Sequence, residues 1–118
     1  MNYVDEAKAV IENLYSDKRN KITTTKIRGL LSGISDIYND VVQQKEDKLD
    51  PGIISRIDYL KVQFVYESGR DPKVRRFIDE SKMIQKIEEI KGNKAKFMEM
   101  ERYMEALVAY HKFYNGED

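Results

Sequence analysis

Apolar residues recur every three to four positions along almost the whole chain, which is the spacing that places side chains on one face of an α-helix. In the segment 24–42 the apolar series is Ile27, Leu30, Leu31, Ile34, Ile37, Tyr38, Val41 and Val42. No segment shows the two-residue alternation of a half-buried strand, and the short run 63–66 lies inside a helical pattern. The sequence therefore predicts an all-α fold, a compact bundle of five to six helices.

Capping residues indicate where the predicted helices begin. Thr24 is predicted to cap a helix that follows the basic linker 17–22. The dipeptides Asp50-Pro51 and Asp71-Pro72 each place a capping carboxylate before a proline at the first helical position, where the missing N–H costs nothing. Asn93 is predicted to cap the last helix.

Glycines and one interruption of the periodicity indicate where helices end. Gly69 follows the helix predicted for residues 51–68, and we expect it in the left-handed conformation that terminates many helices. The apolar residues of the next segment keep to one face only if the helix is broken or kinked near Ser81. Gly92 is predicted to end that segment.

The last predicted helix, which runs to about Tyr114, is apolar on two sides. Its only clearly polar edge consists of Glu101, Glu105 and Lys112. A helix of this kind either lies in the centre of a bundle or is covered by another subunit.

The sequence carries little that supports catalysis. It contains no Cys, which excludes a disulfide, a thiolate metal site and a cysteine nucleophile. The single histidine, His111, lies in the apolar face of the last helix without a catalytic partner at a defined spacing, so we interpret it as a core or interface residue. Gly29 and Gly33 are interpreted as a tight contact between two helices. We therefore predict that the protein is not an enzyme and has no catalytic residue, metal site or cofactor; a hydrolase that uses His111 with carboxylates is the enzymatic alternative.

The length and overall charge bound the class of protein. A chain of 118 residues suits one helical domain, which we expect to span residues 1–118. No apolar run approaches the roughly 20 residues of a membrane helix, and the acidic first turns differ from a secretory signal, so we expect a cytoplasmic protein without a membrane partner. The formal net charge of +0 argues, taken alone, against a polyanionic partner.

The charges are unevenly distributed along the chain. Residues 18–35 contain five cations and no carboxylate, and residues 51–78 contain six cations and three carboxylates. Acidic residues dominate the segments 1–17, 36–50 and 99–118. Because a phosphate backbone responds to the local field, the two basic blocks favour a nucleic-acid contact that the net charge conceals.

One side of the helix predicted after Pro51 combines charge with aromatic rings. Arg56, Tyr59, Gln63 and Tyr66 share a face, and such a row can reach phosphates and sugar hydroxyls. The alternative is that the two tyrosines only edge the core. Lys61 falls between apolar positions, so it either lays its stem over the core or projects from an apolar surface towards an anion.

Three separated segments are similar to one known family. They are KITTTKIRGLLSGISDIYNDV, LKVQFVYESGRDPKVRRFIDESKMI and RYMEALVAYHKFYNG. In residue type, order and spacing they resemble the small subunit of the type III-A CRISPR effector, the Csm complex. The resemblance covers nearly the whole chain from Lys21 to Gly116, and none of the three segments is a catalytic motif.

The resemblance implies a non-catalytic, RNA-binding subunit of a ribonucleoprotein that acts in antiviral defence. In that family several copies stack as a filament along the guide RNA and contact the guide–target RNA duplex through basic residues on helices. The implied partners are therefore guide RNA, target RNA, other subunits of the Csm complex and further copies of this chain. The residue pattern and the resemblance together give the predicted RNA-binding set: Lys26, Arg28, Arg56, Tyr59, Lys61, Arg70, Arg75 and Arg76.

A second class of function fits the residues without the resemblance. The two-sided last helix is also typical of a homodimerisation or adapter module that binds no nucleic acid. The two hypotheses differ in whether the protein binds RNA in a salt-dependent manner.

Overall fold

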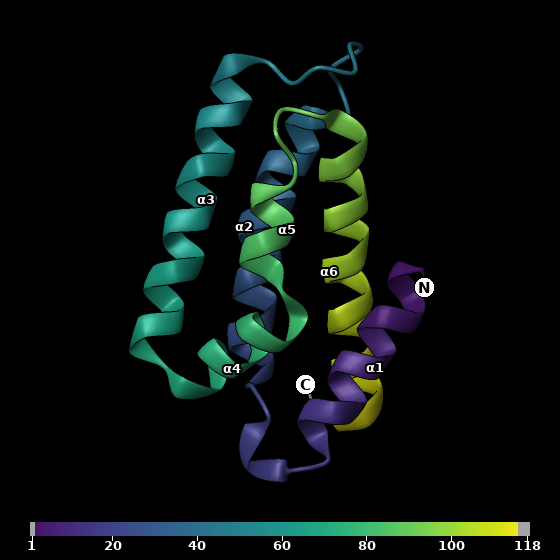
Figure 1. The fold of residues 1–118 in the computed structure, drawn as a ribbon, viewed down its shortest axis with the longest axis vertical. Helices are drawn as coiled ribbons and strands as arrows, with labels where there is room; N and C mark the ends of the chain where they lie inside the picture. Colours follow the sequence, from purple (N-terminus) through teal and green to yellow (C-terminus); the bar gives the residue numbers. More distant parts are fainter. Residues whose placement is uncertain (1, 116–118) are drawn as a thin grey trace.

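The helical periodicity of the sequence is realised as helices throughout the described chain. The computed structural model describes residues 2–115; Met1 and residues 116–118, which the predicted domain 1–118 includes, lie outside the described residues. Residues 2–115 form six α-helices and one short 3-10 helix, with an isolated bridge between Lys48 and Asn93 but no strand (Figure 1). In chain order the elements are α1 (Tyr3–Tyr15), η1 (Lys18–Asn20), α2 (Thr24–Val41), α3 (Pro51–Arg70), α4 (Pro72–Ser81), α5 (Met83–Glu88) and α6 (Lys94–Asn115). The predicted all-α bundle is confirmed.

α6 is the central helix of the bundle. It packs against both α1 and α2 and also contacts α5, whereas α3 packs against α2, α4 and α5. Figure 1 shows α1 crossing the lower half of α6, with α3 at the opposite edge of the molecule. This position accounts for most of the two-sided apolar pattern of α6, although Phe113 remains 74% exposed. No helix within the described part of the chain combines the length and the apolarity that a membrane crossing needs.

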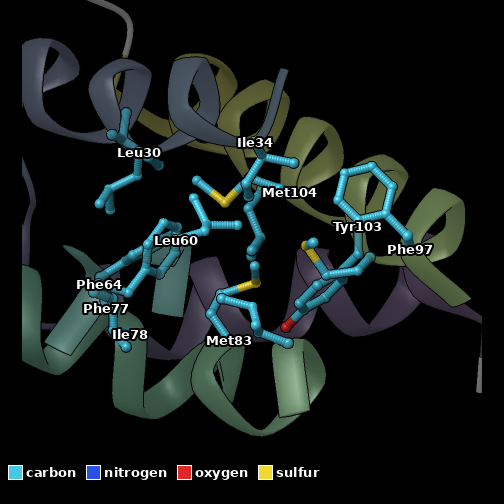
Figure 2. Packing of buried hydrophobic residues seen from close by; sticks show 14 of the residues in the cluster. Leu30, Ile34, Leu60, Phe64, Phe77, Ile78, Met83, Phe97, Tyr103 and Met104 are labelled. Carbon is cyan, nitrogen blue, oxygen red and sulfur yellow. The ribbon is translucent and has the colours of Figure 1, made fainter. Parts of the chain in front are cut away.

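The core is one cluster that takes buried residues from all six α-helices. Figure 2 shows Met104 of α6 among Ile34 of α2, Leu60 of α3 and Met83 of α5. The Tyr103 side chain is buried beside them, and its hydroxyl donates a 2.9 Å hydrogen bond to the carbonyl oxygen of Ser81. The corner between α4 and α5 is thereby fixed to the central helix.

Two predicted helix boundaries are wrong by one or two residues. Thr23, not Thr24, caps α2, because the Thr23 hydroxyl accepts from the backbone N–H of Lys26 at 3.3 Å. α3 continues through Gly69, which is not in the left-handed conformation. The helix ends instead at Arg70, because Asp71, as the residue before a proline, is driven out of helical backbone and has φ −140°.

The predicted starts of α3 and α4 and the break after Ser81 are confirmed, but the predicted capping role of the Asp50 carboxylate is wrong. The Asp71 carboxylate caps α4 by accepting from the backbone N–H groups of Lys73 and Val74, whereas Asp50 occupies the cap position of α3 without a side-chain hydrogen bond. Lys82, in left-handed backbone at φ 58°, makes the break after Ser81 that separates α4 from α5.

The start of α6 also agrees with the sequence. Gly92 has φ 73°, a conformation that glycine adopts without strain. The Asn93 side chain then accepts from the backbone N–H of Lys96 at 2.9 Å. These two neighbouring residues therefore lead the chain into α6, but α5 itself ends at Glu88, so the prediction that Gly92 ends that helix is wrong.

Glu101 contradicts the polar edge expected for α6. Its side chain is only 4% exposed, although the apolar periodicity of the last helix predicted that it faces solvent. Burial, followed by a hydrogen bond and charge repulsion from Glu105, raises the pKa of the Glu101 carboxyl to about 7. The position lies on the side of α6 that the neighbouring helices cover, which periodicity alone did not resolve.

The two glycines of α2 have different surroundings. A Cβ atom at Gly33 would lie 3.3 Å from Leu60 Cδ1, so α3 approaches α2 closely there, as predicted. A Cβ atom at Gly29 would meet nothing within 4 Å. Only one of the two glycines is therefore required by close helix packing.

The glycine pair gives a first prediction. Gly29→Ala should stabilise the fold by about 0.5–1 kcal/mol, because glycine is costly inside a helix and the new methyl group has space. Gly33→Ala should gain less or lose stability, because its Cβ meets Leu60. Urea unfolding measures the free energy of unfolding of each variant, and equal m-values show that the comparison between them is valid. Equal gains at both positions would contradict the close approach of the two helices.

Glu101→Gln should stabilise the protein at pH 8 and change little at pH 5. The pKa of Glu101 in the folded state lies above that of a carboxyl group in the unfolded chain. The contribution of Glu101 to the stability of the wild-type protein is therefore fully present below about pH 4.3 and is lost as the pH rises through about 7. Thermal unfolding at the two pH values measures this, with the exposed Glu99→Gln as the matched control. A melting-temperature difference that does not change with pH would show that Glu101 titrates normally.

Candidate nucleic-acid interface

Cations that lie far apart in the sequence meet at one end of the bundle. In Figure 1 this is the lower end, where η1 lies, where α2 and α4 begin, and where α6 ends. Lys26 of α2 forms an ion pair with Asp71 at the start of α4, and η1 packs against α4. We call this surface the basic end; its cations are Lys18, Arg19, Lys21, Lys26, Arg28, Arg70, Lys73, Arg75 and Arg76. The N-termini of α2 and α4 add the partial positive charge of their backbone dipoles.

Several of these cations are paired with carboxylates on the protein itself. Lys26 contacts Asp71, Arg70 contacts Glu67 at 3.3 Å, and Arg75 contacts Asp79 at 3.6 Å. Such solvent-exposed ion pairs contribute about 0–1 kcal/mol each, so a phosphate can replace the carboxylate at little cost. Lys26, Arg70 and Arg75 can therefore bind an anion, but their carboxylate partners reduce the positive potential that each would produce alone.

An ion pair that involves both carboxylate oxygens lies at the start of η1. Arg19 donates from its guanidinium to both carboxylate oxygens of Asp17, the shorter contact being 2.8 Å. This hydrogen bonding, with a smaller contribution from Arg76, lowers the pKa of Asp17 to about 2. Asp17 thus remains charged at any physiological pH and offsets part of the positive field.

Arg28 and Arg76 differ from the other predicted cations. Within residues 2–115 neither has a carboxylate at ion-pair distance, and both are exposed. Lys18 and Lys73 share this property but were not in the predicted RNA-binding set. Both belong to the basic blocks of the sequence, so the charge pattern alone was sufficient to add them to the predicted RNA-binding set.

Arg56 and Lys61 lie away from the basic end, further up α3. The Arg56 guanidinium contacts the Asp40 carboxylate at 2.5 Å, and Lys61 Nζ donates to Glu88 of α5 at 2.7 Å. Lys61 also lines a groove between α3 and α5 together with Ile57. Its stem lies over the core and its amine reaches a carboxylate, as a snorkelling lysine does. The predicted set is therefore divided between two places on the surface.

The tyrosines of α3 do not edge the core. Tyr59 and Tyr66 are each 64% exposed, and Gln63 between them is also exposed. The guanidinium carbon of Arg70 lies 5.6 Å from the centre of the Tyr66 ring, within the range of a cation–π contact. The interpretation of these rings as core residues is wrong, and they form an open row on the surface.

His111 is a buried structural residue. It is 1% exposed, with its Nδ1 2.5 Å from the Tyr15 hydroxyl of α1 and its Nε2 2.9 Å from the Thr24 hydroxyl of α2. Burial lowers the pKa of His111, and the nearby cations Lys21, Arg28 and Lys112 lower it further. The imidazole therefore joins three helices behind the basic end, and both ring nitrogens are engaged within the protein.

Known proteins match this chain over nearly its whole length. The family described as Csm2 Type III-A matches residues 2–117. A relative from Streptococcus thermophilus, named "CRISPR system Cms protein Csm2", is 41% identical over 99% of this chain and 94% of its own length. Relatives of the same name are 40% identical in Enterococcus italicus, over 84% of this chain and 72% of theirs, and 34% identical in Mycobacterium tuberculosis, over 99% and 94%. The resemblance of the three sequence segments is confirmed.

The engaged ring of His111 gives a prediction about pH. Its folded-state pKa lies below the value of 6.5 for a free histidine, so its contribution to stability is present above pH 6.5 and is lost as the pH falls. His111→Gln should therefore lower the melting temperature clearly at pH 7.5 and less at pH 5. Calorimetry of both proteins measures the two differences. A difference that stays constant between these pH values would contradict a buried, neutral imidazole.

Proposed function

This chain belongs to the Csm2 family of type III-A CRISPR systems, and on that premise we propose that it is a non-catalytic, RNA-binding subunit of a ribonucleoprotein effector in antiviral defence. Membership makes it a small subunit of a type III-A CRISPR complex, with the other Csm subunits as partners. In this proposal several copies stack along the guide RNA, and each contacts the guide–target RNA duplex through basic helix surfaces.

The observation that carries the proposal is the basic end. Three elements that are separate in the sequence, η1 and the first two turns of α2 and α4, bring their cations to one end of the bundle. A complex that selects its target by base pairing needs protein contacts to the backbone and to the shape of the duplex. Lysine and arginine side chains without a base-reading pattern are suited to that task.

The cations contribute to different degrees. Arg28 and Arg76 are the main phosphate contacts, because no carboxylate within the described residues holds them. Lys26, Arg70 and Arg75 contribute by exchanging a carboxylate for a phosphate. Among the remaining members of the predicted set, Arg56, Tyr59 and Lys61 belong to a second contact along α3.

The stacking of copies rests on family membership and not on opposite charges at the two ends of the bundle. The acidic residues of 36–50 lie at the end opposite the basic end, where α2 finishes and the loop to α3 follows (Figure 1). Lys48 pairs there with Asn93 in an isolated bridge, and Lys94 binds the same loop, so these lysines offset much of the acidic charge.

The double variant Arg28→Ala/Arg76→Ala tests the RNA contact. Its affinity for an RNA duplex should fall, and the slope of log K against log salt concentration should decrease in magnitude by about 2, because each phosphate that a side chain neutralises releases roughly one counterion. Fluorescence anisotropy between 50 and 200 mM salt is the measurement. The matched control is Lys8→Ala/Lys45→Ala, which removes two exposed cations outside the basic end.

Two results would contradict the proposal. Equal RNA affinity in the double variant and in its control would show that the basic end is not the contact surface. A stable, salt-insensitive homodimer in light scattering, with no RNA binding even at low salt, would favour the adapter function instead.

A further inference from the structure

The outer face of α3 carries a continuous row of five polar side chains. In order along the helix they are Arg56, Tyr59, Gln63, Tyr66 and Arg70. Successive members are three or four residues apart, so all five point to the same side of α3. We call this row the α3 stripe. Its two ends are cationic, and its three central members are uncharged.

The centre of the α3 stripe has no hydrogen-bond partner within residues 2–115. The Tyr59 and Tyr66 hydroxyl groups and the Gln63 amide are exposed and bind no other described side chain or backbone group. Val62, beside them on the same helix, is 58% exposed. The surface therefore offers neutral donors, neutral acceptors and apolar carbon together.

A groove runs along the α3 stripe on the side of α2. Gly29 and Gly33 line it together with Leu30 and Leu60, and its volume is about 570 Å³. The absence of a side chain at Gly29 leaves open space that a Cβ atom would not fill. The side chains of Tyr59, Gln63 and Tyr66 thus lie beside this groove, and a large ligand can approach them.

These features match the minor groove of an RNA duplex. That groove is wide and shallow, displays ribose 2′-hydroxyl groups, and is bordered by phosphates on both sides. A 2′-hydroxyl both donates and accepts, and so do phenol and amide groups. Arg56 and Arg70 are separated by about 21 Å along the helix axis, at a rise of about 1.5 Å per residue, which allows the two arginines to meet phosphates while the central groups meet riboses.

We propose that Tyr59, Gln63 and Tyr66 contact ribose 2′-hydroxyl groups of the bound duplex, and that these contacts make the protein bind RNA in preference to DNA. The proposal rests on the RNA-binding function proposed above and assigns it a second surface with a different task. The basic end supplies affinity for phosphates of any nucleic acid, and the α3 stripe supplies discrimination of the sugar.

A second copy of the chain is a less suitable occupant of the α3 stripe. If two copies paired through it in antiparallel orientation, Arg56 of one copy would face Arg70 of the other. In parallel orientation each arginine would face its own equivalent. Both arrangements bring two arginines together at each end of the contact, and because Asp40 and Glu67 already pair with these arginines, neither arrangement gains a new ion pair.

The test compares the wild-type protein with the variant Tyr59→Phe/Gln63→Met/Tyr66→Phe. This variant removes the polar groups and keeps ring size, chain length and helix propensity nearly constant. The probes are a 20-base-pair RNA duplex and a DNA duplex of the same sequence, with affinities measured by fluorescence anisotropy. Tyr110→Phe, on α6 and outside the stripe, is the matched control.

The wild-type protein and the control should prefer the RNA duplex. In the triple variant the ratio of RNA affinity to DNA affinity should fall at least about fivefold, because removing each hydrogen bond reduces affinity by a factor of roughly 2 to 12. The salt dependence of RNA binding should stay the same, because no cation has been removed.

Four results would overturn the proposal. An unchanged ratio in the triple variant, or a wild-type protein that binds both duplexes equally, would show that the stripe does not read the sugar while leaving RNA binding by the basic end intact. If light scattering gave the triple variant a different molar mass from the wild-type protein, the stripe would be a contact between copies of the chain. If the wild-type protein bound neither duplex at low salt, the RNA-binding function itself would fail together with this inference.

Discussion

The packing of α6 between α1 and α2 is the interaction on which the other parts of the structure depend. The buried face of α6 packs against α1 and α2 and also contacts α5, within a core cluster to which all six α-helices contribute. Its polar contacts also fix two corners: the Tyr103 hydroxyl binds the end of α4, and His111 binds α1 and α2. Because these contacts hold α1, α2 and α4 in place, η1 lies against α4 and the basic end is assembled.

The surface chemistry follows from this arrangement. The fold gathers cations at one end and separates Arg56 and Lys61 from them, although the sequence places Lys61 and Arg70 in the same basic block. Helix geometry then puts the uncharged Tyr59, Gln63 and Tyr66 in a row on α3. Electrostatic attraction and neutral hydrogen bonding thereby depend on different side chains of a small bundle, so the cations and the uncharged centre of the α3 stripe can be mutated separately.

The features that the sequence predicted correctly are those with local causes. The number of helices, the break after Ser81 and the turn at Gly92 depend on periodicity, proline and glycine within a few residues. The end of α3 was misplaced because two local signals competed, and the extended residue before Pro72 prevailed over Gly69. The burial of Glu101 and the pairing of Lys61 with Glu88 depend on contacts between helices, which a helical wheel does not contain.

The carboxylates that accompany the cations have a consequence for which anions the protein can retain. A single phosphate that displaces Asp71 from Lys26, or Asp79 from Arg75, exchanges one weak contact for another and gains almost nothing. A polymer that presents many phosphates at once releases many counterions in one event, and its gain grows with length. At Lys26 and Arg75 the internal ion pairs therefore set a threshold that a single phosphate does not exceed, whereas Arg28 and Arg76, which have no carboxylate partner within residues 2–115, carry no such threshold.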